Sequence, residues 1–303
     1  MDLNALREFT AVISEGSFAG AARRLNTPKS TVSKRIQDLE TALGTRLIER
    51  TTRKLRLTPE GAVVLGRAER ILADAEEITE ALSGDHSTVR GHLRIAAPTL
   101  FGQSVLAPIA AECRKAYPAL TLEFALQDSQ PDLIEDGYDA AIRIGATTGP
   151  GISTLPLGEI RRCLVAAPEA LTLPLREPED LTDAPTLAQG HGLIQTWHLE
   201  GPGNTRSVRV VAGLSMSSPA ALREAAIAGA GVAMLPAYAV MEDLAQGRLK
   251  ECLPGWSGVP SPLALTYPGA QALTHRLRVF SELLVAAISR RFGTPKPNAN
   301  TVT

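Results

Sequence analysis

The sequence is poor in several features that mark common classes of protein. Its 303 residues include 3 cysteines and 4% aromatic residues, and no run of 18 apolar residues occurs. The missing apolar run argues against a membrane-spanning helix, and the missing CxxC spacing argues against a zinc site or a redox dithiol. The first 16 residues carry acidic side chains where an export signal would be basic. We therefore expect a cytoplasmic protein with no membrane partner, no metal and no cofactor.

The three cysteines, Cys113, Cys163 and Cys252, lie far apart in the sequence. Burial is the favoured interpretation, because free cysteines are among the most buried residues in proteins. A redox-responsive protein that uses one of these thiols remains an alternative. A reactive thiol is distinguished by its exposure and its lowered pKa, which the sequence does not reveal.

Charge is distributed unevenly along the chain. Residues 1–58 carry 11 basic and 6 acidic side chains, a net charge of +5, whereas the whole chain has a net charge of -1. A basic segment on an acidic body is expected where one module alone contacts nucleic-acid phosphates. A solvated charged face would give the same imbalance, so charge alone does not decide between the two.

Apolar spacing and capping residues predict three short helices in this basic segment. The first helix ends at Gly16, and Ser17 is suited to cap the second. The small residues at 21–22 allow two helices to cross closely, as in a helix-turn-helix. Thr27 is suited to the N-cap of the third helix and Pro28 to its first position.

The third helix has the layout of a DNA-recognition helix. Val32, Ile36 and Leu39 share one apolar face, and polar and basic residues crowd the N-terminal surface, which is the part that enters the major groove. Residues 47–58 predict a hairpin with a basic tip, the wing, which can reach the minor groove or the DNA backbone. The predicted contacts with double-stranded DNA are Ser17, Lys29, Ser30, Thr31, Ser33, Lys34, Arg35, Arg53 and Lys54.

A long helix is predicted to begin at Pro59. Its apolar residues follow a heptad spacing, which favours pairing with a second copy of the chain. Pairing also suits DNA, because two recognition helices address two half-sites. Packing of the same residues against the chain's own C-terminal part is the alternative. The heptad-spaced residues, which we call the predicted seam, are Val64, Ala68, Ile71, Ala75, Ile78 and Leu82.

From residue 91 onward, short apolar strands alternate with helical stretches. This order predicts an α/β domain with a mostly parallel sheet. We expect strands at 93–97, 120–126, 140–144, 163–167, 193–197, 208–211, 232–235 and 263–267, and helices at 102–115, 131–136, 219–228 and 273–291.

The ends of these strands predict a ligand site. In open α/β folds, ligands lie outside the carboxyl ends of strands, where helix N-termini offer free amides. Thr99 is the favoured residue, because its hydroxyl and the nearby amides can hold a carboxylate or another anion. A helix cap is the alternative role for Ser217 and Ser218, and packing is the alternative role for Trp197 and His198. The candidate ligand contacts are Thr99, Leu100, Phe101, Gln127, Asp128, Gly145, Ala146, Trp197, His198 and Ser217.

Several stretches of the sequence resemble the LysR-type transcriptional regulators. The resemblance rests on LREFTAVISEGSFAGAARRLN, VSKRIQDLETALGTRLIERTTRKLRLTPEG, LRIAAPTLFG, DLIEDGYDAAIRIG and EAAIAGAGVAMLP. The chain departs from the family at Lys29, where a base-reading Gln is common. Lysine favours guanine acceptors or phosphate over the bidentate contact that Gln makes with adenine.

The resemblance implies an α/β protein with an N-terminal all-α winged helix-turn-helix at 1–58, a linker helix and hinge at 59–90, and a two-lobed effector domain at 91–303 that is similar to periplasmic binding proteins. Lobe I would comprise about 91–160 and 263–292, and lobe II about 161–262. The chain would cross near 159–161 and return near Ser261, and a tail at 293–303 is expected to be disordered.

The same resemblance implies a sequence-specific regulator that binds DNA as a homodimer or homotetramer. A small-molecule effector would bind between the lobes, and an activator would also contact RNA polymerase. We do not expect an enzyme, because no nucleophile–base pair, metal cluster or phosphate loop is recognisable. A transport-type binding protein would carry an export signal, and a purely structural DNA-binding protein would not need a crevice-forming α/β body.

Overall fold

The computed structural model describes residues 2–50, 55–83, 89–146, 149, 151–171, 174–269 and 273–292. The chain divides into two compact units, residues 1–92 and 93–303. None of the helices in the described ranges has the length and apolar character needed to cross a membrane. The predicted disordered tail at 293–303 lies outside the described residues.

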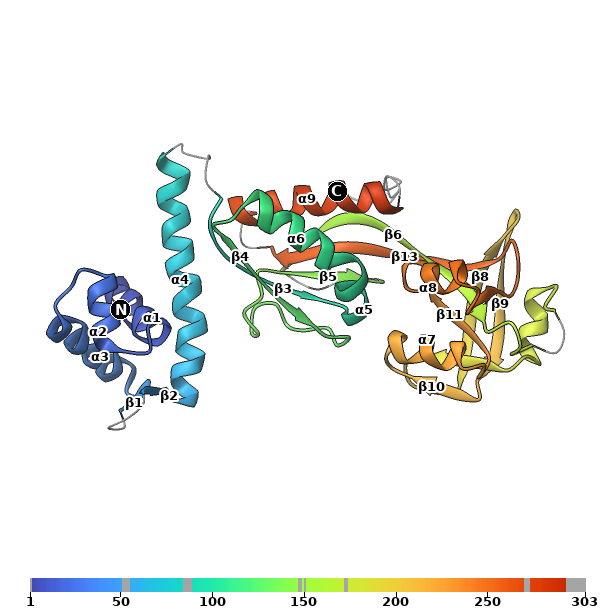
Figure 1. Ribbon diagram of the computed structural model, residues 1–303, viewed down its shortest axis with the longest axis horizontal. Helices are drawn as coiled ribbons and strands as arrows, with labels where there is room; N and C mark the ends of the chain where they lie inside the picture. Colours follow the sequence, from blue (N-terminus) through green and yellow to red (C-terminus); the bar gives the residue numbers. More distant parts are fainter. Residues whose placement is uncertain are drawn as a thin grey trace. The chain divides into compact units, whose positions relative to one another are not determined.

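The N-terminal unit begins with the helices α1 (Leu3–Ser14), α2 (Phe18–Arg24) and α3 (Lys29–Leu43) (Figure 1). The prediction of Ser17 as a cap is confirmed, because its side chain accepts a hydrogen bond from the Gly20 amide. The prediction of Thr27 as the next cap was wrong. Its hydroxyl donates to the Leu25 carbonyl at 3.1 Å, and Pro28 occupies the cap position without a side-chain hydrogen bond.

The core of this unit forms where the three helices meet. Phe9 and Val32 are completely buried and belong to one apolar cluster. Leu3 and Leu43, which the helical spacing places on the same apolar faces, are 44% and 40% exposed because they lie at the helix ends, beyond the packed region. Helical periodicity therefore marks the buried face but not its length.

The predicted hairpin is present as β1 (Ile48–Arg50) and β2 (Leu55–Leu57), which pair antiparallel. Its tip, with Arg53 and Lys54, lies outside the described residues. The long helix α4 (Pro59–Ser83) follows directly. The buried Thr58 hydroxyl accepts from the Gly61 amide at 2.9 Å and donates to the Arg46 carbonyl at 2.7 Å. This hydroxyl therefore ties the start of α4 to the segment that enters the hairpin.

The first half of α4 packs on its own chain. Ala68 and Leu72 are 1% and 9% exposed in the core shared with α1, and Val64 and Ile71 are half-buried against that core. Three of the six predicted seam residues are therefore engaged within the N-terminal unit, a partner that the heptad spacing did not indicate. Ala75 is also half-buried, whereas the side chains of Ile78 and Leu82 lie outside the described residues.

The C-terminal unit is built on one large sheet. Its strand order, in the described part of the chain, is β10-β7-β11-β6-β13-β5-β3-β4. The strands are β3 (Gly91–Ala97), β4 (Leu120–Leu126), β5 (Ala140–Ile144), β6 (Ile152–Ala166), β7 (Thr186–Gln189), β10 (Leu214–Met216), β11 (Val232–Pro236) and β13 (Ser257–Pro268), and the short β12 (Lys250–Glu251) also pairs with β6.

The sheet is mixed, which corrects the expectation of a mostly parallel sheet. Parallel pairing joins β3 to β5, and it joins β7 to both β10 and β11. The two long strands in the middle, β6 and β13, run antiparallel to each other and to their outer neighbours β11 and β5. They must do so because the chain crosses outward along β6 and returns along β13, near Glu159 and Ser261.

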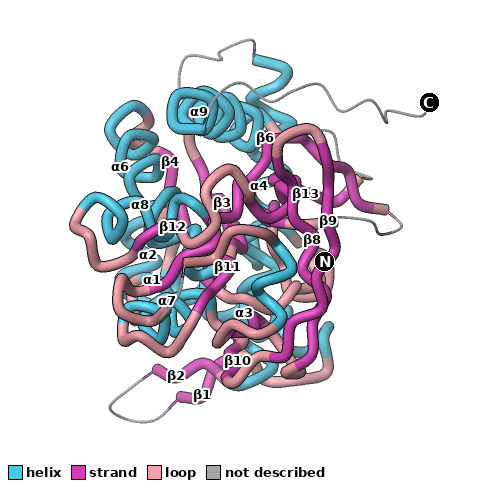
Figure 2. Tube along the Cα trace, turned by 90° about the vertical axis from the view of Figure 1, so that its right-hand side faces the viewer, coloured by secondary structure: helices cyan, strands magenta, loops and turns pink. Residues whose placement is uncertain are grey.

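These crossing strands separate two lobes. Lobe I contains β3, β4 and β5 with the helices α6 (Ala107–Ala116) and α9 (His275–Phe292), and lobe II contains β7, β10 and β11 with α7 (Pro219–Ile227) and α8 (Ala237–Ala245) (Figure 1). A long antiparallel hairpin, β8 (Ile194–Gly201) and β9 (Asn204–Val211), joins β13 in lobe II (Figure 2).

Several local elements differ from the sequence expectations. The helix expected at 102–115 begins earlier, as α5 (Thr99–Phe101), and continues through a π-helical turn (Gly102–Leu106) into α6. The helix expected at 131–136 is a turn, in which the Asp132 carboxylate accepts from the amides of Ile134 and Glu135. The strands β7 and β10 were not predicted because they are only four and three residues long, and the helix α8 was not predicted either.

Candidate functional site

The predicted DNA contacts lie mainly on the first two turns of α3. Lys29, Ser30 and Lys34 are exposed, and Thr31 and Ser33 are half-buried. The apolar face of the same helix is buried in the core. The exposed N-terminal turns therefore present hydroxyl and ammonium groups, which can contact base edges and phosphates.

Arg35 differs from its neighbours on α3. Its Nη1 donates to Oε1 of Glu8 on α1 at 2.5 Å, and the Glu8 side chain is only 3% exposed. The other Glu8 oxygen is buried and has no hydrogen-bond partner among the described residues. Arg35 therefore supplies the charge compensation for a buried carboxylate, a structural role that its place on the polar face of α3 did not reveal.

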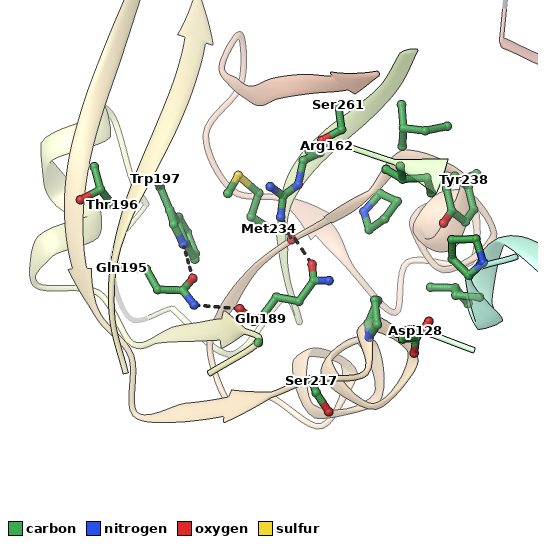
Figure 3. A pocket seen from close by; sticks show the side chains of 17 residues that line it. Asp128, Arg162, Gln189, Gln195, Thr196, Trp197, Ser217, Met234, Tyr238 and Ser261 are labelled. Atoms are coloured by element: carbon green, nitrogen blue, oxygen red, sulfur yellow. Dashed lines mark hydrogen bonds between the residues drawn. The ribbon is translucent and has the colours of Figure 1, made fainter. Parts of the chain in front are cut away.

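A cavity of about 450 Å³ lies in the C-terminal unit between the two lobes (Figure 3). Its walls come from the carboxyl end of β3, from both crossing strands and from the strand ends of lobe II. The lining residues are Pro98, Leu100, Asp128, Ile144, Ile160, Arg162, Gln189, Gly190, Gln195, Thr196, Trp197, Ser217, Pro219, Met234, Pro236, Tyr238 and Ser261.

Four of the ten predicted ligand contacts line this cavity: Leu100, Asp128, Trp197 and Ser217. Ser218, and not Ser217, caps α7, because the Ser218 side chain accepts from the Ala221 amide at 3.4 Å. The packing interpretation of Trp197 also holds, since its side chain is only 3% exposed and belongs to the core of lobe II.

Thr99, the favoured residue, is not among the lining residues. Its backbone amide donates to Oδ1 of Asp128 at 3.0 Å, so a carboxylate of the protein itself occupies the amide that was expected to hold an anion. Phe101 is completely buried and packs edge-on against Tyr238, with ring centroids 5.6 Å apart. Thr99 and Phe101 therefore each contact a residue that lines the cavity, Asp128 and Tyr238 respectively.

The remaining predicted contacts also lie off this cavity. Gln127 lines a smaller neighbouring cavity of about 80 Å³. Gly145 and Ala146 line neither of the two cavities. His198 lies on the β8–β9 hairpin, with its Nδ1 2.9 Å from the Ser207 hydroxyl. His198 is not among the residues that line the cavity, whereas the three preceding residues of β8 are.

Arg162 on β6 is the functional candidate that the sequence analysis missed. Its Nη2 lies 3.5 Å from Oε1 of Gln189 and 3.4 Å from the Met234 carbonyl oxygen, both long for hydrogen bonds. Burial lowers the pKa of its guanidinium, and no ion pair with an acid is present in the described part of the chain. The sequence places Arg162 next to the predicted crossing at 159–161, but no local pattern shows that its side chain lines a cavity.

The wall opposite Arg162 is fixed by a chain of hydrogen bonds. Trp197 Nε1 donates to Oε1 of Gln195 at 3.4 Å, and Nε2 of Gln195 donates to the Gln189 backbone carbonyl at 2.8 Å (Figure 3). Because these bonds occupy the Gln195 amide on both sides, its orientation is set before any ligand arrives. The polar part of the cavity is thus largely preorganised.

The three cysteines are free thiols. Cys113, Cys163 and Cys252 are all buried, and burial raises the pKa of each thiol. Cys163 packs in the apolar cluster on one face of the sheet, whereas Cys252 packs in the cluster on the opposite face. No group of three or more potential metal ligands occurs in the described ranges.

Comparisons with known proteins agree with this architecture. Residues 3–62 match the family described as bacterial regulatory helix-turn-helix protein, lysR family, and residues 86–289 match the LysR substrate binding domain. The uncharacterized regulator YhjC of Escherichia coli is 34% identical over 299 residues, covering 94% of this chain and 97% of its own length. The regulator DmlR of Escherichia coli is 32% identical and covers 93% of each chain.

A similar solved structure is that of CrgA, a LysR-type transcriptional regulator from Neisseria meningitidis. It is 29% identical, with a TM-score of 0.60, and the match covers 95% of this chain and 99% of CrgA. The matched families and relatives are regulators of transcription and not enzymes. The chain therefore belongs to the LysR family of DNA-binding transcriptional regulators and carries the family's effector-binding domain.

Proposed function

We propose that this regulator is controlled by a small anionic molecule that binds in the cavity between lobes I and II. The observation that carries the proposal is Arg162, a half-buried guanidinium that lines the cavity without an acidic partner in the described part of the chain. Partial burial removes some of the water that would solvate this charge, which is the reason its pKa is lowered. A carboxylate on the ligand would supply the missing charge and can bind a guanidinium through two parallel hydrogen bonds.

The position of the cavity supports a role in signalling. Ile160 and Ser261 lie on the two crossing strands, Leu100 belongs to lobe I and Met234 to lobe II, and all four line the same cavity. A ligand here contacts both lobes and the strands that connect them. A ligand that binds one lobe arrangement more tightly than another shifts the population toward it.

On DNA, we propose that the exposed N-terminal turns of α3 enter the major groove, with Lys29 and Lys34 contacting guanine or phosphate. Two or four copies would present their recognition helices to successive half-sites, and the far half of α4 would contribute to pairing. Arg53 and Lys54 at the tip of the wing would contact the DNA beside the helix. If the chain activates transcription, RNA polymerase is a further partner.

Control by oxidation is less well supported. All three thiols are buried with raised pKa values, and Cys163 and Cys252 face opposite sides of the sheet. Reactive cysteines have lowered pKa values and are accessible to solvent. The uncompensated guanidinium in the cavity therefore favours control by a ligand.

The ligand site is tested with the variants Arg162→Met and Arg161→Met in the full-length protein. Arg161 is the matched control, because it is the preceding residue on β6 and its side chain is exposed. Binding of succinate, caproate and ε-aminocaproate would be measured by calorimetry. We expect Arg162→Met to weaken every detectable interaction at least tenfold, about 1.4 kcal/mol, and Arg161→Met to bind like the wild type. Equal binding by Arg162→Met and the wild type would refute the anion site.

The DNA surface is tested by the dependence of operator affinity on salt. Lys34→Ala removes one exposed ammonium from α3, and Lys115→Ala removes an exposed ammonium from the C-terminal unit as a control. If Lys34 contacts a phosphate, its loss reduces the slope of log affinity against log salt by about 0.9. An unchanged slope and footprint for Lys34→Ala would show that this part of α3 does not contact DNA.

A further inference from the structure

The cavity also has a negative end, and its chemistry narrows the class of ligand. The inference that follows rests on the proposed anion site at Arg162. Asp128 follows β4 in lobe I and lines the same cavity, whereas Arg162 enters it from β6 next to lobe II. The two side chains carry opposite charges at neutral pH.

The Asp128 carboxylate is exposed to the cavity and is held by one hydrogen bond. Its Oδ1 accepts a hydrogen bond from the Thr99 amide at 3.0 Å, at the start of the helical run that leads through α5 into α6. No hydrogen bond or ion pair engages its Oδ2 among the described residues. The Thr99 amide is therefore occupied by a carboxylate of the protein, and a second carboxylate from a ligand would lie next to the negative charge of Asp128.

Tyr238 leaves the negative charge of this end uncompensated. Its ring lines the cavity together with Asp128 (Figure 3). Burial, and to a smaller extent the charge of Asp128, raise the pKa of its phenol, so the hydroxyl stays neutral. A neutral hydroxyl can donate to a ligand or accept from it, but it does not offset the negative charge of Asp128.

Apolar side chains line the cavity as well. Leu100 and Ile144 come from lobe I, Ile160 from β6 and Met234 from β11. Together they offer a surface for a hydrocarbon body. The cavity therefore combines a cationic group, an anionic group and an apolar lining.

We propose that the effector is a small aminocarboxylate with an apolar carbon skeleton, whose carboxylate binds Arg162 and whose ammonium group binds Asp128. Each charge of such a ligand meets the opposite charge in the cavity, and the ligand connects the two lobes through two ion pairs. A dicarboxylate of the same length would place its second charge against Asp128. A simple carboxylate would leave Asp128 without a partner.

The test uses matched ligands that differ in a single group. One set is ε-aminocaproate, caproate and adipate, and a shorter set is γ-aminobutyrate, butyrate and succinate. Leucine and isocaproate form a third comparison, in which the ammonium group is next to the carboxylate. Binding to the full-length protein would be measured by calorimetry for the wild type and for Asp128→Asn. Asparagine keeps an acceptor oxygen for the Thr99 amide, so this variant removes the charge without removing the hydrogen bond.

In at least one set, we expect the aminocarboxylate to bind the wild type at least tenfold more tightly than its deaminated or dicarboxylate counterpart, about 1.4 kcal/mol. Asp128→Asn should reduce this preference to about twofold, while the affinity for the simple carboxylate is kept or improved. Asp183→Asn, which removes an exposed carboxylate away from the cavity, should retain the full preference.

The outcomes separate the two proposals. If carboxylates bind through Arg162 but show no preference for an ammonium group, or if Asp128→Asn retains the preference, the aminocarboxylate class is overturned and the anion site stands. If Arg162→Met binds all ligands as the wild type does, the anion site itself is overturned. Binding of none of these ligands to the wild type would also overturn the class proposed here.

Discussion

Replacing Arg35 by alanine should destabilise the N-terminal unit before it affects contact with DNA. The Glu8 carboxylate is 3% exposed, and one of its two oxygens has no hydrogen-bond partner among the described residues. Its other oxygen, Oε1, accepts a hydrogen bond from Nη1 of Arg35 at 2.5 Å. Breaking a buried ion pair by removing one partner costs about 3–5 kcal/mol, whereas an exposed pair is worth about 0–1 kcal/mol. Because the Arg35 side chain is 38% exposed, solvent screens part of the pair, and we expect a loss of roughly 2–3 kcal/mol.

Hydrogen exchange measures this loss locally within the full-length chain. A decrease of 2–3 kcal/mol in the free energy of opening corresponds to exchange roughly 30- to 150-fold faster for the core amides of α1 and α3. Lys34→Ala is the matched control, because Lys34 is the preceding residue on α3 and is exposed. Its effect should stay within about 0.5 kcal/mol.

A double replacement distinguishes a lost ion pair from lost packing. Glu8→Leu combined with Arg35→Leu removes both charges and keeps apolar volume, and such exchanges are often neutral or stabilising. The double variant should therefore restore slow exchange in α1 and α3. If Arg35→Ala leaves exchange unchanged and instead weakens DNA binding with a smaller salt slope, Arg35 is a phosphate contact and our interpretation of the pair is incorrect.

Three further predictions follow from the backbone and from buried groups. A β-carbon at Gly61 would lie 2.1 Å from the Leu47 carbonyl oxygen, so Gly61→Ala should lower the melting temperature and weaken DNA binding. Gly66 has open space around it, so Gly66→Ala should stabilise α4 by about 0.5–1 kcal/mol. A Gly61→Ala variant more stable than Gly66→Ala would contradict this packing. Burial raises the pKa of Cys252 to about 12, so alkylation of this thiol at pH 8 should require unfolding. The stability that the protonated thiol contributes should be complete below its ordinary pKa of 9.0 and decline as the pH rises toward 12. Rapid alkylation of the native chain would argue against burial. Burial opposes the charge of Asp243, yet hydrogen bonds from Arg223 and Arg248 lower the pKa of this fully buried carboxyl, so the stability that the carboxylate contributes should be present above pH about 4 and be lost as the pH falls through the lowered pKa. Asp243→Asn should lose about 3 kcal/mol of stability at neutral pH, and its stability should depend less on pH in acid unfolding experiments. An unchanged dependence on acid pH would contradict the assignment.

The N-terminal helices and several strands were predictable because their signals are local. Ser17 caps a helix that starts at the next residue, and the hydrogen bond joins positions three apart. Strands 120–126 and 140–144 are observed with the predicted bounds, since apolar composition between turn residues marks a buried strand. The sequence also predicted the crossing near 159–161 and 261, through resemblance to a family rather than through local pattern.

Features that depend on distant residues were not predictable in the same way. Glu8 and Arg35 are 27 positions apart, and only the crossing of α1 and α3 shows that they form a pair. The first half of the heptad seam is buried on its own unit because α1 packs there, which the spacing of α4 alone does not show.

The sequence by itself determined that this chain is a LysR-type regulator with a helix-turn-helix and an α/β effector domain, because caps, periodicity and family motifs act over a few consecutive residues. The tertiary structure decided which groups face the ligand. Arg162 and the Met234 carbonyl are 72 positions apart, and Thr99 and Asp128 are 29 apart. The sheet brings each pair together, which turns the expected anion site at Thr99 into a negative end and places the positive end on the crossing strand.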